Sequence, residues 1–386
     1  MAYDTDVRDL PFSVEVRELP GLTRMVLRAC GDVGASADYL HTYRDLPWRD
    51  VSSVGALIAL VKPAHDNVVE AVNTQLRTAL ALHGAEVADR LIKVSQYYAE
   101  TDRKAAARTD RTWRGAEHPE HLTRRYDPLD PPVPLFTDVV RPRDHLRPPP
   151  DHSGDFAASP VDWTRDPFSL TRSGRDLVWQ ATSVGARLGW CDRPIDIFAE
   201  IVKPVVGNWP AMLQLADVFT NIGRACAAVN QNFAENQINV RAVWQGQASE
   251  AFQEHLRLFG LSHVGTQEWL NQVADCYQRI GHSVCALTGK LADVLTRAID
   301  MAVAALVAAQ AAEATAPTII GPAVFGSAAL YEFYQFWQAI QTGRELAEAT
   351  DLVVKRYLKE LVRLTNLDSS TTLPTAPPPL SLPQPA

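Results

Sequence analysis

Residues 273–298 carry an apolar stripe whose spacing leaves few alternatives to a long packed helix. The stripe steps along the chain by 4, 3, 4, 3, 4, 3 and 4 residues, at Val273, Tyr277, Ile280, Val284, Leu287, Leu291, Val294 and Ala298. Apolar side chains at this heptad spacing face a partner helix. A similar stripe lies just upstream, at Leu215, Phe219, Ile222, Cys226, Val229 and Phe233. Two such stripes joined by a short loop predict an antiparallel helical hairpin.

A Trp-x-Gly turn, formed by Trp244 and Gly246, lies between the two stripes. The connection that contains it, residues 236–246, must reverse the chain within about ten residues. Gly246 can adopt a positive φ there without steric cost. Trp244 offers a large flat face that can pack between the ends of the two helices. We therefore expect residues 186–312 to form a hairpin that turns at Trp244 and Gly246.

The first 110 residues repeat this plan more weakly. After an extended lead-in over residues 1–20, a stripe steps by 4, 3, 4 and 3 residues through Val26, Cys30, Val33, Ala37 and Leu40. The helix that it predicts ends near Tyr43. Pro63 suits the first turn of a second helix, which we expect to run to about Arg108. Its late stripe consists of Val87, Leu91, Val94, Tyr98 and Thr101. Residues 1–110 therefore predict another helical hairpin.

The remaining segments separate and follow the two hairpins. Residues 111–185 are rich in Pro and Arg, so we expect a linker that is stiff in places and contains no regular helix. Residues 313–366 predict an Ala-rich bend and two amphipathic helices, over 328–340 and 344–364. Residues 367–386 are rich in Pro, Thr and Ser and predict a disordered tail. The predicted fold is all-α, with two long antiparallel helical hairpins that form a four-helix-bundle-like core.

Composition narrows the class of partner. The formal net charge is −8 and the sequence pI is about 5.7, which argues against nucleic acid as a partner. The sequence does not open with a cationic stretch followed by an apolar run, so we expect no ordinary secretory signal peptide. Five widely spaced cysteines, none in a Cys-x-x-Cys motif, predict neither a disulfide framework nor a cysteine metal site.

Motifs for catalysis are absent from the sequence. It contains no phosphate-binding Gly-x-x-x-x-Gly-Lys-Ser/Thr, no Gly-x-Ser-x-Gly and no His-Glu-x-x-His. His118 and His121 flank Pro119, which forbids the helical spacing that would converge two metal ligands, so we expect a solvated loop. His255 lies beside an apolar stripe, where a packed histidine is expected. We predict a non-enzymatic protein without a cofactor or a metal.

A helical hairpin that turns at Trp-x-Gly resembles the WXG family of helical-hairpin proteins exported by type VII secretion. Residues 193–300 are also similar to the N-terminal modules of large actinobacterial secreted proteins. The matching residues are Asp196, Phe198, Gly207, Trp209, Trp244 and Gly246. Residues 10–110 resemble the EspC-like group of type VII-associated proteins, through Ala88, Leu91, Tyr97, Tyr98, Thr101, Asp102, Ala105 and Ala106.

This resemblance implies an export signal in two parts. In these families a Tyr-x-x-x-Asp/Glu element after the second helix contributes to the signal, and Tyr98 and Asp102 match it. In two-protein complexes of the family, that element lies near the Trp-x-Gly turn of the partner. Each hairpin of this chain holds one part, because the first has Trp48-Arg49-Asp50 at its turn and the second has no Tyr-x-x-x-acid element. We predict that the hairpins pack antiparallel and bring Tyr98 and Asp102 near Trp244 and Gly246.

The resemblance implies a substrate or associated factor of type VII secretion that is secreted or attached to the cell envelope. The partners it implies are a WXG-family protein and the ATPase or a chaperone of the secretion system, and a homodimer is a further option. Two alternatives stay open. Residues 301–340 could bind a membrane interface, or the chain could be a cytoplasmic adaptor that docks a partner through its Pro-rich tail.

Overall fold

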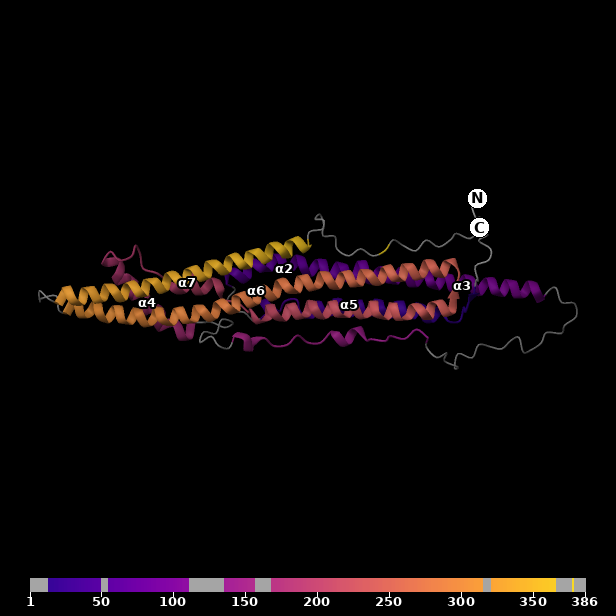
Figure 1. Ribbon diagram of the computed structural model, residues 1–386, viewed down its shortest axis with the longest axis horizontal. Helices are drawn as coiled ribbons and strands as arrows, with labels where there is room; N and C mark the ends of the chain where they lie inside the picture. Colours follow the sequence, from indigo (N-terminus) through magenta and orange to yellow (C-terminus); the bar gives the residue numbers. More distant parts are fainter. Residues whose placement is uncertain are drawn as a thin grey trace, which may run out of the picture.

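The computed structural model describes residues 13–49, 55–110, 135–156, 168–314 and 321–365, together with Pro377. These residues are predominantly helical, so the predicted all-α class is confirmed. The helices are α1 (Leu19–Tyr43), α2 (Ala56–Thr74), α3 (His83–Asp110), α4 (Phe168–Arg187), α5 (Pro210–Val243), α6 (Gln247–Ala314) and α7 (Gly321–Thr365). Figure 1 shows them lying close to the long axis of an elongated helical bundle.

Short elements connect these helices. The turns of 3-10 or π helix are η2 (Leu46–Trp48), η3 (Gln75–Leu82), η5 (Pro142–His145), η6 (Ser153–Phe156), η7 (Phe198–Val202) and η8 (Lys203–Val205). Two strands of two residues each, β1 (Ser13–Val14) and β2 (Trp244–Gln245), pair antiparallel with each other. The extended lead-in and the Trp-x-Gly turn therefore meet in one small ribbon.

In the first hairpin, α1 packs against one helical run made of α2, η3 and α3. Predicted stripe residues on both helices are buried, among them Val26, Val33, Ala37, Leu40, Val87 and Leu91. The start of the second helix differs from the prediction, because it begins at Ala56 and Pro63 lies inside it. Leu57, Ile58 and Val61 are buried on the same helix as Val68 and Val72. Burial of these apolar side chains outweighs the backbone hydrogen bond that Pro63 cannot make.

The second hairpin consists of α5 and α6. The predicted loop of about ten residues is wrong, because α5 continues past Asn236 to Val243 and the chain reverses at 244–246. Asn236 is buried within the helix, where its amide group donates to the carbonyl oxygen of Thr137 at 3.0 Å. Helix α6 has 68 residues, which makes it about 100 Å long at 1.5 Å per residue. All of the predicted stripe over 273–298 is buried except Val294, which is half-buried.

The two hairpins lie side by side. Helix α1 contacts α5, and η2 at the turn of the first hairpin contacts the beginning of α5. The amide of Asn208, just before α5, lies 3.5 Å from the carbonyl oxygen of Leu46 in η2. At the other end, β1 before α1 pairs with β2 at the turn of the second hairpin. The turn of each hairpin thus lies beside the open end of the other.

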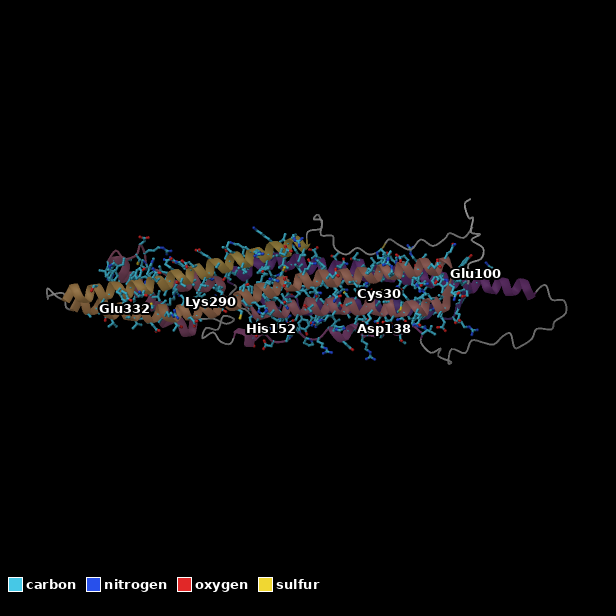
Figure 2. All side chains as sticks on the ribbon, in the orientation of Figure 1. Cys30, Glu100, Asp138, His152, Lys290 and Glu332 are labelled. Carbon is cyan, nitrogen blue, oxygen red and sulfur yellow. The ribbon has the colours of Figure 1, made fainter. Side chains whose placement is uncertain are left out.

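Part of the predicted linker is held against the bundle. Residues 111–134 lie outside the described residues, and residues 135–156, which we call the strap, run along α1 and α5. Asn232 on α5 accepts hydrogen bonds from the backbone N–H groups of Val139 and Val140 at 2.9 and 3.0 Å. Figure 2 labels Asp138 and His152, two strap residues that lie along this side of the bundle. The strap is extended, as expected of a Pro-rich segment, but side chains of α5 fix its path.

Helix α4 corrects the prediction that residues 111–185 contain no regular helix. It covers Phe168–Arg187 and packs against α6. No proline interrupts this stretch, and Val178 and Ala181 bury one face of it. The apolar face of α4 is built from small residues, so its helical periodicity is weak in the sequence. The Pro-rich residues before it gave a stronger indication of an irregular linker.

Helix α7 returns along α6, and the two share the largest contact between elements of the described chain. Two helices were predicted here, over 328–340 and 344–364, but α7 is continuous through Gly343. One glycine inside a helix costs only about 1 kcal/mol, and the residues buried on both sides of it include Phe336, Ile340, Val354 and Leu361. Residues 315–320 of the Ala-rich bend and the tail 367–386, apart from Pro377, lie outside the described residues. Among the described helices, none is long and apolar enough to cross a membrane.

Candidate functional site

The first candidate site is the ribbon at the turn of the second hairpin. Val14 of β1 pairs with Trp244 of β2, and Ser13 pairs with Gln245. The backbone N–H of Glu15 extends the ribbon by donating to the carbonyl oxygen of Val243 at 2.7 Å. Because β1 leads directly into α1, this pairing ties the start of the first hairpin to the turn of the second.

The turn itself has a fixed conformation. Gly246 has a φ of 113°, a region that side chains with a Cβ rarely adopt. The hydroxyl of Ser249 donates to the carbonyl oxygen of Trp244 at 2.6 Å, and Gln253 donates to that hydroxyl at 3.0 Å. The backbone N–H of Glu250 donates to the carbonyl oxygen of Gly246 at 3.0 Å. These bonds satisfy the polar groups of a tight reversal and hold Trp244 in one place.

Trp244 lies in an aromatic cluster at this end of the bundle. Its side chain is buried and stacks on Phe252 of α6, with ring centroids 5.8 Å apart and an interplanar angle of 30°. The ring of Tyr98 on α3 meets it edge-on, at 6.3 Å and 78°. Among the described residues, the indole Nε1 of Trp244 has no hydrogen-bond partner. Aromatic pairs in these arrangements contribute about 0.5–1.5 kcal/mol beyond their area burial.

The sequence singled out Tyr98 and Asp102 in the first hairpin and Trp244 and Gly246 in the second. The structure brings one residue of each pair together. Tyr98 and Trp244 are in contact, so their predicted proximity is confirmed. Gly246 adopts the positive φ that was expected of it. Asp102 lies on α3 one turn beyond Tyr98, and its side chain lies outside the described residues. The role of these residues in export stays a prediction.

Sequence reasoning missed Ser249 and the pairing of β1 with β2. Ser249 is the third residue of α6 and its hydroxyl donates to a carbonyl oxygen of the turn, so it does not show the N-cap pattern that would have indicated it from the sequence. The alternation of Val14 and Val16 did indicate an extended lead-in. Its partner strand could not be predicted, because strand pairing across 230 residues leaves no local pattern.

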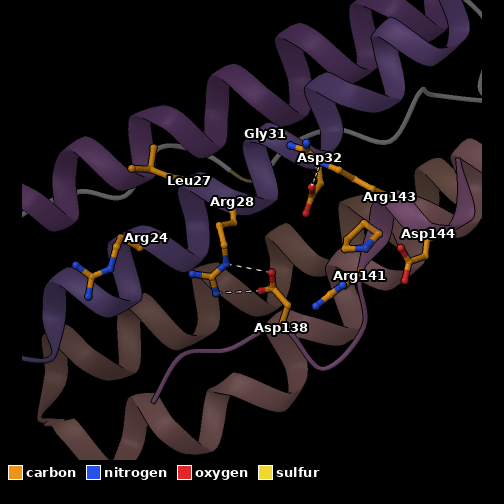
Figure 3. Close-up of a pocket in the computed structure, with 10 residues that line it drawn as sticks. Arg24, Leu27, Arg28, Gly31, Asp32, Asp138, Arg141, Arg143 and Asp144 are labelled. Atoms are coloured by element: carbon orange, nitrogen blue, oxygen red, sulfur yellow. Dashed lines mark hydrogen bonds and ion pairs between the residues drawn. The ribbon is translucent and has the colours of Figure 1, made fainter. Parts of the chain in front are cut away.

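A second candidate is a groove between α1 and the strap (Figure 3). It encloses about 730 Å³, and its lining residues include Arg24, Arg28, Asp32, Asp138, Arg141 and Arg143. Arg28 makes two hydrogen bonds of 3.0 Å to the carboxylate of Asp138, and Arg143 makes one of 2.7 Å to Asp32. Burial raises the pKa of Asp32, and Arg143 opposes this rise. Both ion pairs join the strap to α1, so the arrangement fastens the strap to this helix.

Within the described ranges, no three His, Cys, Asp or Glu side chains converge as a metal-binding group. His118 and His121 lie outside these ranges. Glu254 pairs with Arg257 at 2.7 Å, and His255 is buried beside His83. His255 is therefore a packed histidine, as expected from its place beside the apolar stripe.

Comparisons with known proteins add no relative. No protein-family model matches the chain, and neither a curated protein nor a solved structure matches it. The assignment of a function rests on the residues and their geometry.

Proposed function

We propose that this chain is a non-enzymatic helical protein exported by type VII secretion, and that it carries both parts of its export signal. The observation that carries the proposal is the edge contact between Tyr98 and Trp244. Each residue belongs to a different hairpin, and each matches one half of the signal that the family resemblance implies. A single chain with this contact would need no second protein to complete the signal.

The arrangement of the hairpins supports this proposal. In this proposal, α1, the run α2–η3–α3, α5 and α6 act together as one four-helix-bundle-like core. The turn of the second hairpin lies beside the open end of the first, where β1 pairs with β2. Tyr97, next to Tyr98, is 57% exposed, and α3 extends past the end of the second hairpin in Figure 1. A secretion ATPase or chaperone would bind this end of the bundle.

Export is the direct test. We would express the tagged chain in a host with an intact type VII system and in one that lacks its ATPase, and compare culture filtrates. We expect export only from the intact host and a loss of about tenfold for Tyr98→Ala, because an aromatic edge contact contributes up to about 1.5 kcal/mol. Tyr98→Phe keeps the contact and is expected to retain most of the export.

Tyr331→Ala is the matched control. Tyr331 is 61% exposed on α7, at the opposite end of the bundle, which Figure 2 marks with Glu332. Equal export by wild type and Tyr98→Ala at equal cellular levels would contradict the composite signal. If the wild type stayed in the cell in both hosts, we would favour the cytoplasmic adaptor.

The second candidate function is membrane binding. The feature that favours it is the end of the bundle formed by α6 and α7. Residues 301–340 contain two charged residues, Glu313 and Glu332, and no Lys or Arg. Exposed large apolar side chains gather here, at Val303, Val307, Leu330, Tyr331 and Tyr334. Apolar and aromatic side chains without nearby charge can insert into the boundary region of a bilayer.

Liposome flotation tests this second candidate. The purified chain should float with vesicles of neutral phosphatidylcholine, because the segment offers no cationic residues to favour anionic lipid. A Val307→Glu/Tyr334→Glu variant should stay at the bottom of the gradient, since each buried charge opposes insertion. Leu352→Glu, at a side chain 69% exposed elsewhere on α7, is the control and should float like the wild type. If the wild-type protein did not float with the vesicles, the membrane-binding proposal would be wrong.

A further inference from the structure

Three polar pairs join the two hairpins along α6. The pairs are His65–Tyr277, Gln75–Thr266 and His83–His255, and we call them the inter-hairpin seam. One member of each pair comes from the run α2–η3–α3 and the other from α6. All six side chains are buried. Because a buried polar group without a partner costs about 1–3 kcal/mol, the seam is stable only while each pair is kept.

The neutral pair His83–His255 is held by one proton between the two rings. The two Nε2 atoms lie 3.2 Å apart, so one must carry a proton and donate while the other is bare and accepts. A proton added to the acceptor Nε2 makes that ring positive and leaves two N–H groups facing each other, and a second proton would make both rings positive. Arg90 on α3 adds positive charge near both rings, and Glu86 partly offsets it at His83. The apolar edge of Phe259, 5.1 Å from His83, offers no compensation.

The environment of the pair His65–Tyr277 also disfavours a positive charge on the histidine. Nδ1 of His65 lies 2.7 Å from the Tyr277 hydroxyl, and Trp48 of η2 covers the imidazole ring at 4.6 Å. Nε2 of His65 is buried and has no hydrogen-bond partner among the described residues. The charged groups that act on this ring are Asp66, Lys62 and Asp45. Asp66, Asp45 and the backbone of Arg44 favour a charged ring and Lys62 opposes it, but burial outweighs these groups and lowers the pKa of His65.

Burial sets the direction of the titration. It lowers the pKa of His65 and of His255 from the usual 6.5 to about 4, and it lowers the pKa of His83. Burial also lowers the pKa of His263 on α6 to about 4, and His83 contributes to this shift. A state in which these rings reach water binds more protons than the closed state. The closed state therefore loses stability as the pH falls below 6.5 and keeps losing it down to about 4.

Among the described residues, the other contacts between the hairpins contain no pair with a buried histidine. On the α1 side, Arg28 and Arg143 reach from α1 and the strap to carboxylates, and Asn232 binds the strap backbone to α5. Within the second hairpin, α5 and α6 pack through aromatic stacks such as Phe219–Tyr277 and Phe233–Phe259. Protonation of the seam leaves the α1–strap–α5 contacts in place.

We propose that the inter-hairpin seam is an acid-sensitive joint, at which α2–η3–α3 separates from α6 while the helices stay folded and α1 stays attached to α5. The joint would open at mildly acidic pH, because both histidine pairs are buried and a positive charge on a buried ring loses its hydration. This inference does not depend on export. It describes how one of the two contacts between the hairpins can open while the other stays closed and the helices stay folded.

The experiment follows aromatic packing and helix content in the full chain between pH 7.5 and 4.0. Near-ultraviolet circular dichroism reports the packing of Tyr277 and Trp48, and far-ultraviolet circular dichroism reports the helices. We expect the near-ultraviolet signal to be lost at a higher pH than the far-ultraviolet signal. The double variant His83→Gln/His255→Gln keeps a hydrogen-bonding pair without a titratable ring. It should lower the midpoint of the near-ultraviolet transition by at least about half a pH unit.

His282→Gln is the matched control, because His282 lies on α6 and is exposed. Its midpoint should equal that of the wild type. His65→Gln provides a second test at the other histidine pair and should also lower the midpoint. The proposal is overturned if wild-type packing persists to pH 4.0, if both signals are lost together, or if His282→Gln shifts the midpoint as much as the seam variants.

Discussion

Replacing Trp244 with alanine is expected to lower the free energy of unfolding by about 3–5 kcal/mol, the usual range for deleting a buried aromatic side chain. The indole is 2% exposed and fills the space between Phe252 and Tyr98. Its backbone also belongs to β2, so the cavity would form where the lead-in strand meets the turn. Denaturant unfolding at pH 7.5, with the midpoint and the m-value compared, measures the loss.

Trp179→Ala is the matched control for this prediction. Trp179 on α4 is 49% exposed, and substitutions of that kind change stability by about 0.5 kcal/mol or less. Trp244→Phe should retain part of the stack on Phe252 and fall between wild type and Trp244→Ala. A loss below about 1 kcal/mol for Trp244→Ala would show that the turn does not depend on its tryptophan. This series also identifies which variants are stable enough to be used in an export assay.

Gly55→Ala is expected to destabilise the protein by about 3 kcal/mol, at the upper end of the range for overpacked sites. A Cβ at Gly55 would lie 2.2 Å from the carbonyl oxygen of Val206 and 2.8 and 2.9 Å from those of Lys203 and Pro204. These are backbone atoms, so no rotation of a side chain can relieve the contact. The N–H of Gly55 also donates to the Val206 oxygen at 3.0 Å, and that bond would lengthen. Thermal and denaturant unfolding measure the effect.

Gly34→Ala is the control that separates the effect of limited space from the general effect of replacing glycine with alanine. Gly34 lies inside α1, and a Cβ there would meet no atom within 4 Å. Alanine at such a helical position is expected to stabilise by about 0.5–1 kcal/mol, because glycine loses more backbone entropy on folding. The two variants should therefore change stability in opposite directions. A neutral Gly55→Ala would mean that the segment 203–206 can move away from the start of α2.

Heptad spacing predicted the helices well because it reports which face of a helix is buried. The stripes over 26–40, 215–233 and 273–298 belong to α1, α5 and α6. Helix ends were harder to predict. The sequence carries local signals for a helix break at Pro63, at Gly343 and near Asn236. In each case the helix continues, because burial on both sides outweighs a local cost of a few kcal/mol.

The candidate site could be predicted only where a family pattern supplied the link between distant residues. That pattern indicated the proximity of Tyr98 and Trp244, which are in contact. The seam had no such signal, since His83 and His255 are separated by 172 positions and neither lies in a motif. Helix α4 was missed for a different reason, because its buried residues are small and its neighbours are rich in proline.

The unbroken course of α6 fixes the separation between the two ends of the molecule. The helix starts beside Trp244 and ends at Ala314, about 100 Å away at 1.5 Å per residue. Two ligands of ordinary globular size, one at each end, would not touch each other. Occupancy at one end therefore leaves the other sterically free, and a single copy of the chain can hold two bodies at a set spacing.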